Sequence, residues 1–254
     1  MRVSWTPERE SAYRLCEQAL QIDPENSRAL SLLSLKFSQR SAFFASHDRE
    51  ADLRRADELA SLAIKIDPDF SLALSAKGDA LLLTGRYRDA IDSYRRAQML
   101  IPSAIQPGLA LAYVFVGEPD QAIAYADKAQ RLSPHGPTSL WPSIYLAKAL
   151  AFSMLQDHEE ALLWIERAET AAPDALLMGF VRSALLALAG QEDEARATMQ
   201  RYLANDKSPI RTMSQWHARE PGKPLPSYSP LTLARLLLWK KKFDDGLLKA
   251  GLPE

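Results

Sequence analysis

Residues 71–102 read SLALSAKGDALLLTGRYRDAIDSYRRAQMLIP, and this stretch predicts two helices that fold back on each other. Small and large apolar residues recur at helical spacing in both halves: Ala73, Leu74, Gly78 and Leu81 in the first, and Ala90, Tyr94 and Ala97 in the second. A turn is expected at Thr84-Gly85-Arg86, and Pro102 ends the second helix because it lacks an N–H. The small residues allow two helix backbones to approach, and the large residues fill the space between them.

The same order of small, large and proline residues recurs along the whole chain of 254 residues. The recurring sets are Ala12, Cys16, Ala19 and Pro24; Ala56, Ala60, Ala63 and Pro68; Ala122, Ala126, Ala129 and Pro134; Ala161, Ile165, Ala168 and Pro173; and Gly190, Ala195 and Met199. The first set forms a leading half-repeat, with Thr6 as its N-cap and Pro7 as its first helical residue. Insertions are expected near residues 41–49 and 135–141. This period of roughly 34 residues is typical of a helical repeat array.

The stretch 71–102 resembles the tetratricopeptide repeat. In the first helix, that family has a small residue in the middle and a large residue three positions later. In the second helix it has Ala, then an aromatic residue, then Ala, and a proline closes the repeat. Gly78, Leu81, Ala90, Tyr94, Ala97 and Pro102 fill these places in order. The resemblance implies an all-α fold, a right-handed α-superhelix of about five helical hairpins with a C-terminal capping segment.

The resemblance also implies a concave groove lined by the first helices, which binds a partner protein or peptide. Carried over to this sequence, the groove consists of Leu72, Ser75, Asp79, Leu82, Leu111, Val114, Phe115, Leu146, Leu150, Met154, Phe180 and Leu188. It lacks the Lys, Arg and Asn with which other members clamp a peptide carboxylate. A continuous apolar surface of this kind indicates a partner, unless the chain's own tail covers it.

Three basic residues, Lys77, Lys148 and Arg182, share one place in their repeats, where the family usually has Leu. Either each side chain extends past its neighbours to reach water, or the three form a row that pairs with acidic groups of a ligand. Both interpretations stay open from the sequence.

The repeat period is lost after residue 207. We therefore expect a repeat superhelix over 1–207, followed by a segment 208–254 that contains a proline-rich connector at 219–230. A helix with Leu231, Leu233, Leu236, Leu237 and Trp239 should follow, and then a second short helix through Phe243, Leu247 and Leu248. The segment has two possible destinations: the end of the last hairpin near Met199 and Tyr202, or the groove near Phe115, Met154 and Phe180. We favour the first because repeat arrays need a capped end.

Three phrases carry a second resemblance: DREADLRRADELASLAIKIDP, AQRLSPHGP and the ending LLKAGLPE. They are similar to the C-terminal helical-repeat regions of bacterial class III adenylate cyclases and winged-helix transcription regulators. The resemblance implies a regulatory or sensing arm of a signalling protein, with an attached N-terminal effector domain. A stand-alone adaptor is the alternative.

Composition argues against several other functions. The formal net charge is −1, from 31 basic and 32 acidic residues, which does not favour a nucleic-acid binder. Cys16 is the only cysteine and the four histidines are scattered, so neither a metal site nor a cofactor is expected. No nucleophile, base and carboxylate set suggests an enzyme. No apolar run suits a membrane helix and no signal peptide is apparent, so we expect a cytoplasmic protein. The oligomeric state stays open.

Overall fold

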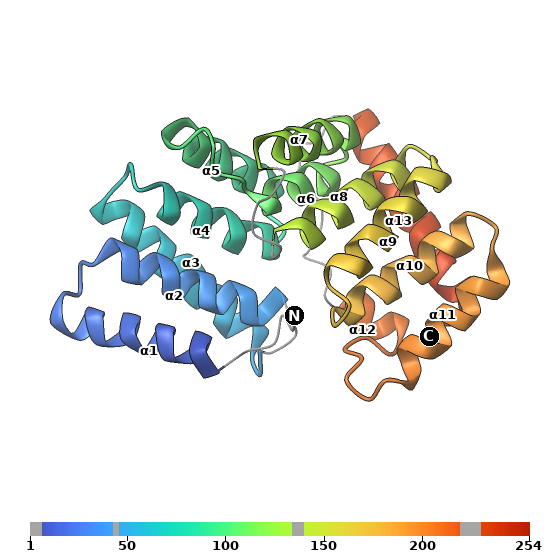
Figure 1. Ribbon diagram of the computed structural model, residues 1–254, viewed down its shortest axis with the longest axis horizontal. Coiled ribbons are helices and arrows are strands. Elements are labelled where there is room, and N and C mark those ends of the chain that lie inside the picture. The colour runs from blue at the N-terminus through green and yellow to red at the C-terminus, as the bar shows by residue number, and fades with distance from the viewer. Residues whose placement is uncertain (1–6, 43–45, 134–139, 219–229) are drawn as a thin grey trace. The chain divides into compact units, whose positions relative to one another are not determined.

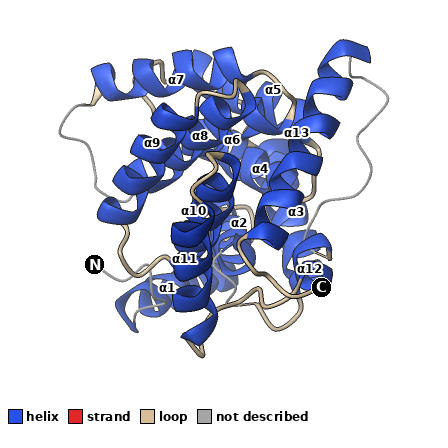
Figure 2. Cartoon of the chain, turned by 90° about the vertical axis from the view of Figure 1, so that its right-hand side faces the viewer, coloured by secondary structure: helices blue, strands red, loops and turns tan. Residues whose placement is uncertain are grey.

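The computed structural model describes residues 7–42, 46–133, 140–218 and 230–254, and every regular element in these ranges is an α-helix (Figure 2). The described residues divide into two compact units, one that extends to Ala112 and one formed by Tyr113–Glu254. Residues 43–45 and 135–139 of the two predicted insertions, and the predicted connector up to residue 229, lie outside the described residues.

The unit up to Ala112 contains five whole helices and most of a sixth. They are α1 (Pro7–Ile22), α2 (Ser27–Ala42), α3 (Arg49–Ile66), α4 (Ser71–Leu83), α5 (Tyr87–Leu100) and the first part of α6 (Pro107–Phe115). Helices α2 and α3 form one hairpin, α4 and α5 form the next, and α1 packs on α2 as the predicted half-repeat (Figure 1). Pro7 is the first residue of α1, as expected. Asp48 caps α3 by accepting a hydrogen bond from the Ala51 N–H at 3.0 Å.

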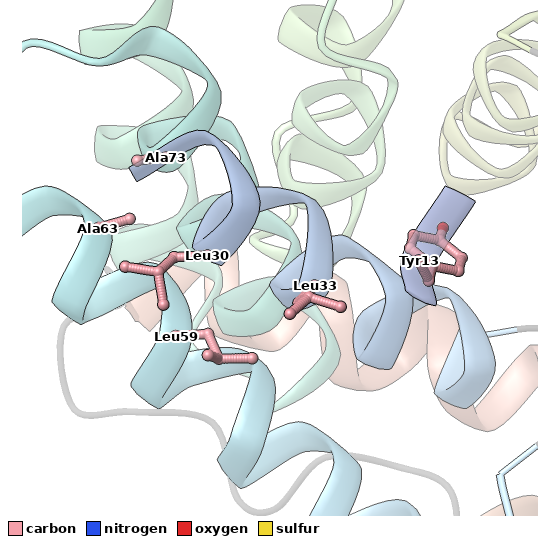
Figure 3. Packing of buried hydrophobic residues seen from close by; sticks show 6 residues of the cluster. All are labelled: Tyr13, Leu30, Leu33, Leu59, Ala63 and Ala73. Carbon is pink, nitrogen blue, oxygen red and sulfur yellow. The ribbon is translucent and has the colours of Figure 1, made fainter. Parts of the chain in front are cut away.

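The core of this unit forms where apolar residues of successive helices meet. Leu30 and Leu33 of α2 lie beside Leu59 and Ala63 of α3, and all four are at most 5% exposed (Figure 3). The Ser34 hydroxyl donates to the Ala56 carbonyl at 2.7 Å, which shows how closely the α2 backbone approaches α3. Small residues at these crossings therefore serve the packing role that their spacing predicts.

The unit Tyr113–Glu254 contains the remaining helices: α7 (Pro119–Leu132), α8 (Trp141–Met154), α9 (His158–Ala171), α10 (Leu176–Leu188), α11 (Glu192–Ala204), α12 (Met213–His217) and α13 (Pro230–Lys249). Helices α8 and α9 form one hairpin, and α10 and α11 form the last one (Figure 1). Residues 208–218 and 230–254 belong to the same compact unit as these hairpins.

The expected division of residues 231–248 into two helices is wrong, because α13 is continuous from Pro230 to Lys249. Nothing between Trp239 and Phe243 interrupts a helix. Gly246, which would weaken an isolated helix, lies where α13 crosses α10, and a Cβ there would lie 2.9 Å from the Ala184 carbonyl oxygen. The side chains of Leu231 and Leu233 lie outside the described residues.

In each described hairpin from α4 to α11, the turn that follows the first helix contains a residue with positive φ. Gly85, Gly117 and Gly190 have φ values of 79°, 77° and 78°, and Gln156 fills the same place with a φ of 63°. Glycine adopts this conformation without steric cost, whereas a Cβ is strained there. Gln156 is thus a local weakness in an otherwise glycine-based turn.

We expect Gln156→Gly to raise the free energy of unfolding by about 1 kcal/mol, since it removes the left-handed strain of a residue with a side chain. Urea denaturation followed by circular dichroism measures the change. Gly190→Ala, at the equivalent turn with φ of 78°, is the matched control and should destabilise by a similar amount. Equal stability of Gln156→Gly and the parent protein would contradict the strain at this turn.

Candidate functional site

Four of the predicted groove residues lie on one face of α4. Leu72, Ser75 and Asp79 are each partly exposed, and Leu82 is 9% exposed. Leu111 of α6 is also partly exposed. A spacing of three or four residues places the α4 residues along one side of the helix. In the unit up to Ala112, the predicted face is therefore apolar, open in part to solvent, and has one carboxyl group.

The predicted groove residues of the other unit are more deeply buried. Val114 and Phe180 are fully buried, and Leu146, Leu150 and Met154 are at most 9% exposed, while Phe115 and Leu188 are partly exposed. Helix α13 packs against α10 and α8 on this side. The Trp239 indole N–H donates to the Ser153 hydroxyl at 3.2 Å, and a Cβ on Gly246 would meet the Ala184 carbonyl oxygen. The chain's own C-terminal helix thus covers the predicted surface here.

The sequence of α13 explains why it lies on this face. Its buried residues recur about every three or four positions and form one stripe: Leu236, Trp239, Phe243, Gly246 and Leu247. Leu237, Leu238, Lys241 and Leu248 on the other side are exposed. An amphipathic helix of this kind is stable only against an apolar surface, which α8 and α10 supply.

A chain of aromatic rings joins α13 to the last hairpin. Phe180 of α10 lies 5.4 Å from both Tyr202 of α11 and Trp216 of α12, between ring centroids. Trp216 and Trp239 in turn lie 6.0 and 5.5 Å from Phe243. These tilted ring pairs have the geometry that aromatic side chains favour. The tail therefore occupies both places considered from the sequence, residues 208–217 at the end of the last hairpin and α13 on the groove face.

Hydrogen bonds hold the segment before α13 and the residues after it. The Ile210 N–H donates to the Tyr202 hydroxyl at 2.9 Å. The Met213 N–H donates to the Pro253 carbonyl at 2.7 Å, and the Trp216 indole N–H donates to the Asp244 carboxylate at 2.9 Å. His217 lies 3.3 Å from the same carboxylate.

The three basic residues of the predicted row each pair with a carboxylate of their own chain. Lys77 lies 2.6 Å from Asp57 on α3, and Lys148 lies 2.8 Å from Asp127 on α7. Arg182 reaches Glu169 on α9 at 3.2 Å and Glu194 on α11 at 2.9 Å. In each case a first helix is joined to the second helix of the preceding hairpin. Sequence reasoning identified the cations and missed these acidic partners, which lie on a different helix.

Lys148 has a further contact that indicates a structural role. Its ammonium group lies 3.4 Å from the centroid of the Trp164 ring, and only 6% of its side chain is exposed. A buried cation is stable only with such compensation, here a carboxylate and an aromatic face. The geometry thus supports internal pairing of this lysine.

Asp79 is the one carboxyl on the α4 face, and the Tyr94 hydroxyl of α5 donates a hydrogen bond to it. Burial raises the pKa of Asp79 from 3.8 to about 6, and the hydrogen bond from Tyr94 opposes part of that rise. Gly108 of α6 lies against the same tyrosine, since a Cβ there would come 2.1 Å from its hydroxyl oxygen. Asp79, Tyr94 and Gly108 therefore join three helices within one unit.

This raised pKa gives a pH dependence with a defined sign. The folded state favours the protonated form of Asp79, because its pKa is higher there than in the unfolded chain. The contribution of Asp79 to the free energy of unfolding is therefore fully present below pH 3.8 and is lost as the pH rises through about 6. We expect Asp79→Asn, which keeps an acceptor for Tyr94, to raise the free energy of unfolding by up to about 3 kcal/mol at pH 8. At pH 4 the two proteins should be equally stable. Urea titrations at both pH values measure this, and a gain independent of pH would contradict it.

The structure offers few groups for other chemistry. Within the described ranges, no cluster of three or more His, Cys, Asp or Glu side chains is arranged to hold a metal ion. No helix there is long and apolar enough to cross a membrane. Cys16 lies partly exposed on α1, and burial raises the pKa of its thiol.

Comparisons with known proteins agree with this architecture. A tetratricopeptide-repeat family model matches residues 43–106 and 108–175, which together are half of the chain. No curated protein matches. Among solved structures, Pseudomonas aeruginosa PilF is 20% identical, with a TM-score of 0.52, over 84% of this chain and 90% of that one. A tetratricopeptide-repeat protein from Parabacteroides merdae is 16% identical, with a TM-score of 0.56, over 95% of this chain and 91% of that one. The predicted all-α repeat fold is confirmed.

Proposed function

The chain belongs to the tetratricopeptide-repeat family, and on that premise we propose that it acts in the cytoplasm as the regulatory or sensing arm of a bacterial signalling protein. Proteins of this family are scaffolds for protein–protein interaction. The proposed partner is a protein or peptide segment that binds on the α4 face, together with an N-terminal effector domain that the arm regulates.

One observation carries the choice of the α4 face. Leu72, Ser75 and Asp79 stay partly exposed there, whereas α13 covers the corresponding face of α8 and α10. A partner segment on α4 would place apolar groups on Leu72 and a hydrogen-bond donor beside Ser75 and Asp79. Such a mixture of apolar contact and few polar groups is typical of a recognition surface.

The signalling context rests on the resemblance of three phrases, and the structure gives one of them a physical role. In the ending LLKAGLPE, Leu247, Ala250 and Leu252 are at most 3% exposed, and the Pro253 carbonyl accepts the bond from Met213. The phrase is thus part of the folded unit. A stand-alone adaptor with the same surface is the second candidate.

A matched pair of variants tests the surface. Leu72→Glu introduces a charge on the α4 face, and Leu62→Glu introduces the same charge on α3, at a leucine that is 42% exposed. Quantitative mass spectrometry should find a partner that cross-links to the parent and to Leu62→Glu but not to Leu72→Glu. Partners retained equally by both variants would show that the α4 face is not the site.

The mass of the native polypeptide tests the signalling context. An antibody raised against this chain should detect a protein well above 28.3 kDa in the source cells if an effector domain is attached. A band at 28.3 kDa would instead favour the stand-alone adaptor.

A further inference from the structure

Both polar side chains on the α4 face present hydrogen-bond acceptors. The Ser75 hydroxyl donates its proton to the Ser71 carbonyl at 2.9 Å, so only its lone pairs remain for a ligand. Asp79 accepts the Tyr94 bond through Oδ1, and no described residue donates to its other oxygen, Oδ2. Ser75 and Asp79 are both partly exposed. A segment that binds on this face therefore has to supply the donors.

The charge of Asp79 is not compensated by a cation of the protein. Burial raises the pKa of Asp79 to about 6, so the carboxyl is ionised at pH 8, and no described lysine or arginine pairs with it. On the neighbouring helix α3, by contrast, Asp57 pairs with Lys77 at 2.6 Å. An ionised carboxyl held in this way lowers the stability of the free protein, which is a common property of binding sites. A cation that binds from outside would remove this cost.

We propose that Asp79 anchors an arginine side chain of the partner segment. The inference rests on the proposed function, since it names the chemistry of the segment that binds the α4 face. Ser75 and Asp79 are four residues apart on a helix, which places their Cβ atoms ~5–6 Å from each other. A guanidinium group has several N–H donors in one plane, so it can bind Oδ2 of Asp79 and Oγ of Ser75 together, whereas an ammonium group is a point charge.

Apolar residues on either side of this polar pair define the rest of the segment. Leu72 lies about one turn before Ser75 and Leu83 about one turn after Asp79, and both leucines are partly exposed. At 1.5 Å per residue they lie ~16 Å apart along the helix. In an extended segment, alternate side chains point to one side and the ends of five residues lie ~13 Å apart. The segment that fits is therefore apolar–x–Arg–x–apolar, with its apolar side chains on the two leucines.

A selection of random pentapeptides displayed on phage, with the full chain immobilised at pH 8, tests this motif. The recovered peptides should share an arginine with apolar residues two positions to either side. A parallel selection on Asp79→Asn should not enrich arginine, because this variant removes the charge and keeps an acceptor for Tyr94. Asp92→Asn removes a carboxylate from an exposed position of α5, and its selection should match that of the parent.

The affinity of a recovered peptide measures the contribution of the charge. On the parent, replacing arginine by citrulline, which keeps the shape and removes the charge, should raise the Kd about tenfold. On Asp79→Asn, the two peptides should have the same Kd to within about twofold. Ser75→Ala should raise the Kd of the arginine peptide about fivefold, because one acceptor is lost.

The outcomes separate this inference from the proposed function. A selection that enriches no arginine, or enriches it equally on Asp79→Asn, would overturn the inference. Leu72→Gln removes an apolar contact without adding charge, so peptides that need Leu72 but contain no arginine would leave the α4 face as the site and contradict only the arginine. Peptides that bind Leu72→Gln as well as the parent would contradict the proposed function. Competition by arginine amide as strong as by the peptide would also overturn the inference, because the ligand would then be a small cation.

Discussion

Phe243→Ala should lower the free energy of unfolding of the Tyr113–Glu254 unit by about 3–5 kcal/mol. Phe243 is 3% exposed and lies between Trp216 and Trp239, so its removal leaves a cavity in the contact between α13, α12 and α10. A loss of this size approaches the whole stability of an ordinary domain.

Urea denaturation followed by tryptophan fluorescence measures this effect, because Trp141, Trp164, Trp216 and Trp239 all lie in the unit. Leu248→Ala is the matched control on the same helix, since Leu248 is 43% exposed, and it should change stability by less than about 0.5 kcal/mol. If Phe243→Ala leaves the midpoint unchanged, α13 does not form part of the core of this unit.

Gly78→Leu should have the second large effect, a loss of about 3 kcal/mol or more from overpacking. A Cβ at Gly78 would lie 2.5 Å from Cε1 of Tyr94, which is 1% exposed. Gly108 lies against the hydroxyl of the same ring, so the ring is held at a second place. The side chain added at Gly78 would therefore force α4 away from α5.

Gly179 of α10 provides the control for Gly78. The nearest atom to a Cβ there is Oε1 of Glu169 at 3.7 Å, which is ordinary contact. Gly179→Ala should stabilise the protein by up to about 1 kcal/mol through helix propensity, whereas Gly78→Ala should destabilise it. Thermal melting of the two alanine variants tests the opposite signs. Stabilisation by both would show that α4 and α5 do not cross closely at Gly78.

The pairing of helices could be predicted from the sequence because close packing requires particular residues at particular places. Only a small residue fits where Ser34 meets the Ala56 carbonyl, and only a residue free of a side chain fits beside the Tyr94 ring. Such requirements repeat with each hairpin, so they leave a periodic signal. This signal predicts which helices pair, where the turns lie and which residues of each second helix are buried.

The position of α13 could not be predicted in the same way. Its stripe of Leu236, Trp239, Phe243 and Leu247 fits any apolar surface, and the two candidate surfaces were both apolar. The choice depends on the close approach of Gly246 to Ala184 and on the bond from Trp239 to Ser153. These contacts join residues 62 and 86 positions apart, beyond the reach of local patterns.

The acidic partners of the basic residues were missed for a related reason. Asp57 and Asp127 lie on exposed sides of second helices, where acidic residues are ordinary. Only the register between adjacent hairpins places them beside Lys77 and Lys148. The role of the α4 face in partner binding stays a prediction.

The bond between Met213 and Pro253 has a consequence for synthesis on the ribosome. Leu247 and Leu252 complete the core of their unit, although α10 ends at Leu188, some 60 residues earlier. At translation rates of ~5–20 residues per second, α10 emerges roughly 3–12 s before the end of the helix that covers it, and α8 emerges earlier still. During that interval the nascent chain exposes Phe180 and its neighbours, so this unit completes its folding only after α13 has emerged and is until then a natural client for a chaperone that binds apolar segments at the tunnel exit.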